Sequence, residues 1–221
     1  MTDFLVFINF KTYSQATGEG AVGLAQICAE VSKEKEVQII PIVQAVDLSQ
    51  ITKSVDIPVW VQHLDPFPPG QFTGWISLEA VIKAGAGGTL LNHSEHQLPF
   101  GTIRQTISRI KNCKNFNSMV CAKTLGQLER FIKLKPDFIA YEVSELIGAR
   151  TSIVDVNPKA VRRAVQISDG IPLIIGAGID KAEDLFKVKE LGAKGVLISS
   201  AVVLAENPKE KLGELVSLLN T

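Results

Sequence analysis

The stretch Gly88-Thr89-Leu90-Leu91-Asn92-His93-Ser94-Glu95-His96-Gln97 joins a short apolar run to a cluster of polar side chains. The apolar run, residues 88–91, has the length and composition of a short buried strand. A helical pattern begins just after the polar cluster. Parallel α/β folds place their chemistry at the carboxyl ends of their strands. His93 is therefore a candidate catalytic residue, and we expect partners of specific types from other strand ends.

Strand-like and helix-like segments alternate along the whole chain. Eight apolar runs are each followed by a helix or a helical turn, which predicts a parallel sheet. Eight repeats without a long linker favour a single (β/α)8 barrel domain over residues 1–221. An open, doubly wound sheet is the alternative that this pattern leaves. The expected strands are 4–8, 37–43, 59–61, 88–91, 118–122, 137–141, 172–175 and 196–198.

Composition excludes several classes of protein. The chain has 221 residues, with 23 basic and 23 acidic side chains, so its formal net charge of zero argues against nucleic-acid or membrane-surface partners. No apolar stretch approaches the roughly 18 residues of a membrane helix. Cys28, Cys113 and Cys121 show no CxxC spacing, which favours reduced thiols and a cytoplasmic location. No cluster of metal ligands is present, and we expect neither a metal nor an organic cofactor.

Polar and small residues follow five of the expected strands, and in a barrel these positions converge on one rim. A lysine there supplies a fixed positive charge, a carboxylate in a dry pocket can act as a general base, and an imidazole can polarise a carbonyl group. Small residues let backbone N–H groups approach a phosphate, which barrels often bind after strands seven and eight. The residues are Asn9, Lys11, His93, Glu95, Glu142, Gly176, Gly178, Ser199 and Ser200.

Each of these residues also has an ordinary structural interpretation. Lys11 alone is typical of a solvated surface lysine, His93 of a hydrogen-bonded structural histidine, and Glu142 of a surface or helix-capping carboxylate. The glycines can simply make a turn, and the serines can cap the next helix. Their joint occurrence at the right strand ends favours the functional interpretation.

Six segments carry a resemblance to a known family. They resemble the triosephosphate isomerase family. The segments are Ile8-Asn9-Phe10-Lys11-Thr12-Tyr13, Asn92-His93-Ser94-Glu95-His96, Tyr141-Glu142 with Glu145-Leu146-Ile147-Gly148, Thr73-Gly74, Gly176-Ala-Gly-Ile179 and Gly195-Val-Leu-Ile-Ser-Ser200. The similarity is greatest to its short, archaeal-type branch, and it spans the whole chain in order.

The resemblance implies a reaction and a set of catalytic residues. The family interconverts dihydroxyacetone phosphate and D-glyceraldehyde 3-phosphate by proton transfer through an enediolate, without a cofactor. It implies that Glu142 is the base, that His93 is a neutral electrophile, and that Lys11 and Asn9 hold the charged substrate. Glu95 would pair with Lys11 and position it.

The sequence also suggests why His93 would be neutral. Ser94-Glu95-His96-Gln97 has the S-x-x-Q form of a capping box, so we expect His93 at a helix amino terminus, where the positive end of the dipole disfavours a second proton.

The resemblance also implies the residues that bind the substrate and a lid that closes over it. The segment after Glu142 would be that lid, which excludes water during the reaction. Three positions depart from the family pattern: Val143-Ser144 replaces its usual prolines, Ala149-Arg150 stands at the lid tip, and Ala201 replaces a glycine. The implied substrate-binding residues are Asn9, Phe10, Lys11, Ile147, Gly148, Gly178, Ser199 and Ser200.

The loop from His63 to Gly74 predicts an oligomer. Three prolines and two glycines exclude regular structure there. In the family this loop inserts beside the active site of a neighbouring subunit, with Thr73 near Lys11. The aromatic rings of Phe67, Phe72 and Trp75 favour burial against a partner over an ordinary surface loop. We expect a homodimer or a homotetramer.

Two other functions are compatible with parts of the pattern. A phosphate-binding barrel that is a lyase or synthase would use the same glycine and serine turns. Such a barrel does not need Asn9, Lys11, His93 and Glu142 together, so this set argues against it. The third possibility is a non-catalytic homologue that retains the phosphate pocket.

Overall fold

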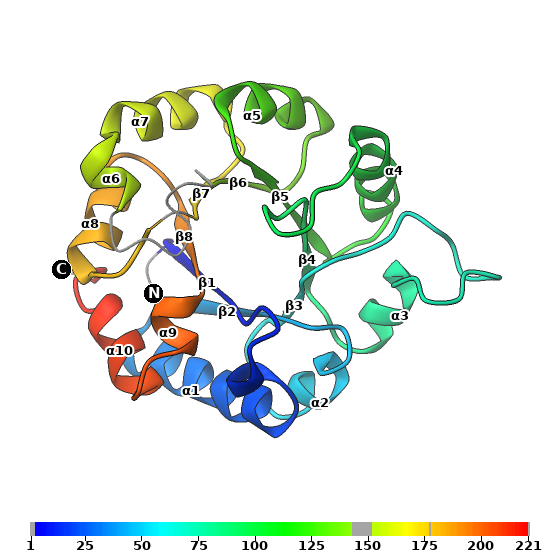
Figure 1. The fold of residues 1–221 in the computed structure, drawn as a ribbon, viewed down its shortest axis with the longest axis horizontal. Coiled ribbons are helices and arrows are strands. Elements are labelled where there is room, and N and C mark those ends of the chain that lie inside the picture. The colour runs from blue at the N-terminus through cyan, green and yellow to red at the C-terminus, as the bar shows by residue number, and fades with distance from the viewer. Residues whose placement is uncertain (1–2, 143–151, 177, 221) are drawn as a thin grey trace.

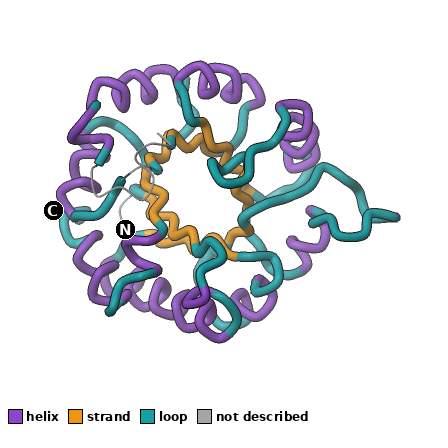
Figure 2. Tube along the Cα trace, in the orientation of Figure 1, coloured by secondary structure: helices purple, strands orange, loops and turns teal. Residues whose placement is uncertain are grey.

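Eight parallel strands form a closed barrel in chain order, surrounded by helices (Figures 1 and 2). The structure is a computed structural model, and it describes residues 3–142, 152–176 and 178–220. The expected (β/α)8 barrel is confirmed, and the open sheet is wrong, because β1 pairs with both β2 and β8. The strands are β1 Leu5–Asn9, β2 Gln38–Val43, β3 Trp60–Val61, β4 Gly88–Leu91, β5 Asn117–Ala122, β6 Phe138–Tyr141, β7 Leu173–Ile175 and β8 Gly195–Ile198.

The helices cover the outside of the barrel (Figure 1). Three short elements, η1, α6 and α9, were not expected, because three or four residues are too few to show a helical period. The helical elements are η1 Ser14–Ala16, α1 Glu19–Lys35, α2 Leu48–Thr52, α3 Leu78–Lys83, α4 Phe100–Ile110, α5 Leu125–Phe131, η2 Ile132–Leu134, α6 Ile153–Val156, α7 Pro158–Ile167, α8 Ala182–Glu190, α9 Ser200–Val203 and α10 Pro208–Leu215.

Aromatic side chains fill the middle of the barrel. Phe7 of β1, Trp60 of β3 and Phe138 of β6 meet edge to face, with ring centroids 5.0 to 5.8 Å apart. Such pairs stabilise a core beyond the burial of their area. Gly88 of β4 makes room for the indole, since a Cβ atom there would lie 2.5 Å from the ring of Trp60. The barrel interior is therefore a packed core.

The alternation of side chains along each strand determines what reaches the barrel mouth. Successive residues of a strand point to opposite faces, so every second residue faces the interior. Five residues near the strand ends lie two positions after an interior side chain, and the same alternation directs them toward the mouth. They are Asn9, Gln62, Glu142, Gly176 and Ser199, which follow Phe7, Trp60, Ala140, Ile174 and Leu197.

A second apolar core lies between the barrel and the helices. α4 places Ile103, Ile107 and Ile110 on one buried face, at the spacing of an amphipathic helix. Proline at the first turn of α7 and the side chain of Asn157, which accepts the N–H of Ala160, start that helix.

The cysteines are unpaired, as expected. Cys28, Cys113 and Cys121 are all free, and burial raises the pKa of the Cys28 thiol to about 12. Among the residues that the structure describes, no helix combines the length and the apolar character needed to cross a membrane.

Barrel closure at the first and last strands depends on a glycine. A Cβ atom on Gly195 would lie 2.3 Å from the carbonyl oxygen of Leu5. We expect Gly195→Ala to lower the free energy of unfolding by roughly 1–3 kcal/mol. The matched control is Gly23→Ala in α1, where a Cβ atom meets nothing within 4 Å and alanine should stabilise the helix by about 0.5–1 kcal/mol. Urea unfolding followed by circular dichroism measures both, and equal effects would contradict the closure argument.

Candidate active site

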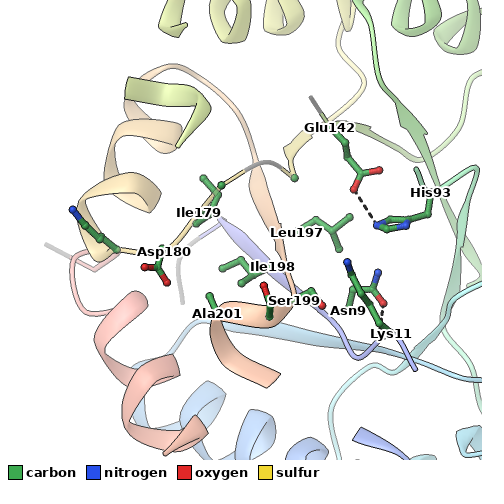
Figure 3. Close-up of a pocket in the computed structure, with 14 residues that line it drawn as sticks. Asn9, Lys11, His93, Glu142, Ile179, Asp180, Leu197, Ile198, Ser199 and Ala201 are labelled. Carbon is green, nitrogen blue, oxygen red and sulfur yellow. Dashed lines mark hydrogen bonds and ion pairs between the residues drawn. The ribbon is translucent and has the colours of Figure 1, made fainter. Parts of the chain in front are cut away.

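A pocket of about 610 Å³ lies at the carboxyl ends of the strands (Figure 3). It brings together eight of the residues expected from the sequence: Asn9, Lys11, His93, Glu142, Gly176, Gly178, Ser199 and Ser200. In Figure 3, His93 and Glu142 lie at one end, and Ser199 and Ala201 lie toward the other. The remaining lining residues are Ile179, Asp180, Lys181, Leu197, Ile198 and Ala201.

Two expected site residues that the structure describes, Phe10 and Glu95, do not line the pocket. Phe10 is fully buried in the core between the barrel and the helices, because it lies at the alternate position to Asn9 and its side chain faces outward. Glu95 contacts Lys11 and His93 instead of lining the pocket. Ile147 and Gly148 lie outside the described residues, as does the expected lid.

Lys11 is held in place by its backbone and by Glu95. Its Nζ atom lies 2.6 Å from Oε1 of Glu95, and its backbone N–H donates to Oδ1 of Asn9 at 3.0 Å. Its φ angle is 49°, in the left-handed region, which costs a side-chain-bearing residue about 1–2 kcal/mol. Surrounding contacts have to hold such a conformation, and it brings the ammonium group to the pocket.

Asn92 turns the chain so that His93 faces the pocket. Strict alternation after Leu90 would direct His93 outward, but the φ angle of Asn92 is 61°, and asparagine tolerates this left-handed conformation better than most residues. The Asn92 side chain donates to the carbonyl of Cys121 at 2.8 Å and accepts the N–H of Leu98 at 2.8 Å. It thus fixes the loop that carries His93 and Glu95.

The contacts of the His93 ring indicate a neutral imidazole. The backbone N–H of Glu95 donates to Nδ1 at 3.3 Å, so Nδ1 carries no proton. Nε2 lies 3.2 Å from Oε1 of Glu142 and therefore carries the single proton. Nδ1 is also 3.6 Å from Oε2 of Glu95, but an ion pair there would need the proton that the N–H contact excludes.

The expected capping box at Ser94 is wrong. Residues 93–96 form a turn, in which the N–H of His96 donates to the carbonyl of His93 at 2.8 Å, and α4 begins only at Phe100. Pro99 is the reason: a helix from Ser94 would contain a proline in its interior, and the residue before a proline disfavours the helical region. A single backbone N–H in a turn, rather than a helix terminus, therefore keeps His93 neutral.

Glu142 is almost fully withdrawn from solvent, with 2% of its surface exposed. Its Oε2 atom is buried and has no hydrogen-bond partner among the described residues. Burial, followed by the charge of Glu142, raises the pKa of the neighbouring Cys121 thiol well above 9.0. Gly176 makes room for the carboxylate, because a Cβ atom there would lie 2.9 Å from Cγ of Glu142. A poorly solvated carboxylate of this kind is suited to accept a proton.

The other end of the pocket, where Asp180 and Lys181 also line it, offers uncharged hydrogen-bond donors. The hydroxyl oxygen of Ser199 is buried and has no partner within the described ranges. α9 begins at Ser200, and N–H groups in the first turn of a helix have no acceptor within it. Gly178, with a φ of 65°, completes this end. Such N–H groups favour an anion.

Two polar residues near the site were not identified from the sequence. Asn92 is predicted only as part of a polar cluster, and Gln62 lies between the expected strand 59–61 and the loop that begins at His63. The alternation after Trp60 was the available signal for Gln62. In the part of the chain that the structure describes, no group of three or more His, Cys, Asp or Glu side chains could hold a metal.

The fold and the pocket first define a class of protein: a (β/α)8 barrel with a buried imidazole–carboxylate pair and an anion-accepting end in one pocket. A family model described as triosephosphate isomerase matches residues 4–219. The chain therefore belongs to the triosephosphate isomerase family.

Relatives named triosephosphate isomerase cover nearly the full length of the chain. The protein of Methanothermus fervidus is 37% identical over 217 residues, covering 96% of this chain and 97% of the relative. That of Methanocaldococcus jannaschii is 38% identical over 219 residues, with 97% and 100% covered. That of Saccharolobus solfataricus is 38% identical over 216 residues, with 96% and 95% covered. These archaeal relatives confirm the expected branch.

The ring contacts of His93 predict one tautomer near neutral pH. In a protein with ¹⁵N-labelled imidazole rings, we expect Nδ1 of His93 to resonate in the unprotonated range and Nε2 in the protonated range. His93→Gln, which removes the resonances, assigns them. Two protonated nitrogens would show that the Glu95 N–H contact does not hold the ring neutral.

Proposed function

We propose that the chain catalyses the cofactor-free interconversion of dihydroxyacetone phosphate and D-glyceraldehyde 3-phosphate, the reaction after which its family is named. One observation carries the proposal most strongly: a buried carboxylate, Glu142, lies 3.2 Å from a neutral imidazole, His93, in the pocket that Lys11 also lines. This reaction belongs to glycolysis and gluconeogenesis. Its place in these pathways and the three unpaired cysteines of the chain both support a cytoplasmic location.

Glu142 moves the proton between carbons in this proposal. Its carboxylate removes a proton from the carbon next to the carbonyl group, and the electron pair of that C–H bond forms the enediolate. The same proton then returns to the adjacent carbon, and the hydroxyl proton passes from one enediolate oxygen to the other. The substrate is thereby isomerised and the base is regenerated. The position of Glu142 in the pocket, 3.2 Å from His93, supports this role, because a general base has to lie within reach of the proton that it removes.

His93 stabilises the oxygen atoms while the proton moves. Its Nε2–H donates to the carbonyl oxygen and then to the enediolate oxygens, as a preorganised donor in a dry site. Triosephosphate isomerase is itself the established example of a neutral histidine in this role. The Glu95 N–H contact at Nδ1 supports the same protonation state here.

Lys11, Asn9 and the small residues hold the substrate. Lys11 places a positive charge beside the phosphate and the enediolate, Glu95 fixes its ammonium group, and Asn9 binds a substrate oxygen. Gly178, Ser199 and Ser200 supply donors for the phosphate. Ile147 and Gly148 complete this end in the proposal, with the segment after Glu142 as a lid that excludes water.

Removal of the base tests the reaction. We expect Glu142→Gln, which keeps the size of the side chain, to lower kcat by about 10²–10⁴-fold while the protein stays folded. A coupled assay with glyceraldehyde 3-phosphate measures this, and Glu129→Gln on the exposed side of α5 is the matched control. A wild-type protein without turnover would refute the isomerase reaction, and a fully active Glu142→Gln would refute only the base. A lyase, a synthase or a non-catalytic homologue would not turn over this substrate efficiently without a cofactor.

We also propose a homodimer or homotetramer formed through the loop His63–Gly74. This loop, between β3 and α3, projects beyond the ring of helices (Figure 1). Near its end the ring of Phe67 stacks on Phe72 at 4.6 Å and meets Trp75 at 4.7 Å. Trp75 is 54% exposed in the single chain and Phe72 is 38% exposed. Large apolar rings on a projecting loop favour burial against a second copy.

Light scattering of the purified protein tests this assembly. We expect a mass of at least two chains, and dissociation of the double variant Phe72→Ser, Trp75→Ser, because the loop loses its apolar contact area. Phe186→Ser on α8 is the control, since that ring is also exposed, at 41%, but lies on another part of the barrel. A monomeric wild type, or a double variant of unchanged mass, would contradict the proposed interface.

A further inference from the structure

Gln62 lies just outside the pocket and contacts two residues that line it. It follows β3 at the position where the alternation after Trp60 directs a side chain to the barrel mouth. Its Nε2 atom lies 2.9 Å from the carbonyl oxygen of Lys11 and 3.3 Å from Oδ1 of Asn9. A third, longer contact of 3.4 Å joins it to the carbonyl oxygen of Ile42. One amide group thus connects the ends of β1, β2 and β3.

The partners fix which way both amide groups point. The N–H of Lys11 can only donate, so the atom of Asn9 that it contacts must be the oxygen Oδ1. Gln62 then faces this oxygen and two carbonyl oxygens, all acceptors, and must present its NH₂ group. With Oδ1 of Asn9 engaged by two donors, Nδ2 is the part of the Asn9 amide left to contact a ligand.

The same donor supports the unusual backbone of Lys11. A lysine with a φ of 49° keeps that conformation only when its surroundings fix it. On its amino side the N–H is bound by Asn9, and on its carboxyl side the carbonyl is bound by Gln62 at the shortest of the three distances. Both peptide groups that flank the strained residue are therefore held by side chains.

The contact with Ile42 does not explain the residue as a simple tie between strands. The carbonyl oxygen of Ile42 already accepts the N–H of Phe10 at 3.0 Å, and the backbone N–H of Gln62 already binds the carbonyl of Val43. Main-chain hydrogen bonds thus join β1, β2 and β3 without the side chain. The two shorter contacts, to Asn9 and Lys11, are the ones that only the side chain makes.

We propose that Gln62 is a positioning residue for the isomerase reaction. It orients the Asn9 amide with Nδ2 toward the substrate, and it holds Lys11 in the left-handed conformation that brings its ammonium group to the pocket. Gln62 does not line the pocket itself. This inference rests on the proposed function and adds to it a residue that acts through two others.

A double-mutant cycle tests whether Gln62 acts through Asn9. Gln62→Met keeps the length of the side chain and removes the donor, so kcat/KM should fall by about 10–100-fold, the effect of a small misplacement of substrate-binding groups. The fall should lie mainly in kcat, because Gly178, Ser199 and Ser200, the proposed donors for the phosphate, are untouched. In the double variant with Asn9→Ala, we expect a loss smaller than the product of the two single losses, since part of the effect of Gln62 acts through Asn9.

Gln127→Met is the matched control. The Gln127 side chain also binds a backbone group near a strand end, the N–H of Lys123 at 2.8 Å, but it does not contact Asn9 or Lys11. We expect its kcat/KM to equal that of the wild type.

A second variant keeps the test decisive if Gln62→Met does not fold. Gln62→Glu has the same shape, but its ionised carboxylate places negative charge against three acceptor oxygens. When the pH falls, this carboxyl group gains a proton and becomes a donor again. The kcat of Gln62→Glu, expressed relative to the wild type at each pH, should therefore rise as the pH is lowered.

The outcomes separate the inference from the proposed function. A wild type without isomerase turnover would overturn both. If the wild type is active, unchanged kinetics of folded Gln62→Met, or losses that multiply independently in the double variant, would overturn the role of Gln62 alone. For Gln62→Glu, an activity ratio that does not change with pH would do the same.

Discussion

Closure of the barrel is the constraint on which the rest of the structure depends. Because β1 pairs with β8 as well as β2, every strand has one face toward a common axis, and the two-residue period selects which side chains lie there. In the middle of the barrel those side chains are Phe7, Trp60 and other apolar residues that fill the interior. At the ends of the strands the same alternation directs polar side chains toward the barrel axis. The packed core therefore lies directly beneath the pocket.

Protonation in that pocket is controlled by short-range contacts rather than by net charge. The chain has no net formal charge, yet the described pocket contains a buried carboxylate, a lysine and an imidazole. One backbone N–H, that of Glu95, settles the tautomer of His93. The proton on Nε2 then faces Glu142, so the imidazole and the carboxylate are already in contact before a ligand arrives. The carboxylate of Glu95 contacts the ammonium group of Lys11, and the backbone N–H of Glu95 contacts the ring of His93. One residue therefore holds both the lysine and the histidine in place.

The sequence predicted the barrel and most of the polar groups because both follow from periodicity along the chain. Strand ends are visible as apolar runs that stop, and Asn9, Lys11, His93 and Glu142 stand there. The failures have local causes. The helix expected at Ser94 is prevented by Pro99, and α6 and α9 are too short for a pattern. Gln62 is not predicted because β3 has only two residues, and its hydrogen bonds to Asn9 and Lys11 join residues more than 50 positions apart in the chain.

Gly176 shows that part of the site is specified by an empty volume. The carboxylate of Glu142 occupies space that any other residue at position 176 would claim with its first side-chain atom. The position of the Glu142 carboxylate thus depends on two neighbouring strands. Glu142 follows β6, and Gly176, which has no side chain, follows β7. A side chain added at the end of β7 to narrow this pocket would therefore displace the carboxylate of Glu142. A redesign of the shape of the pocket would have to leave position 176 unchanged.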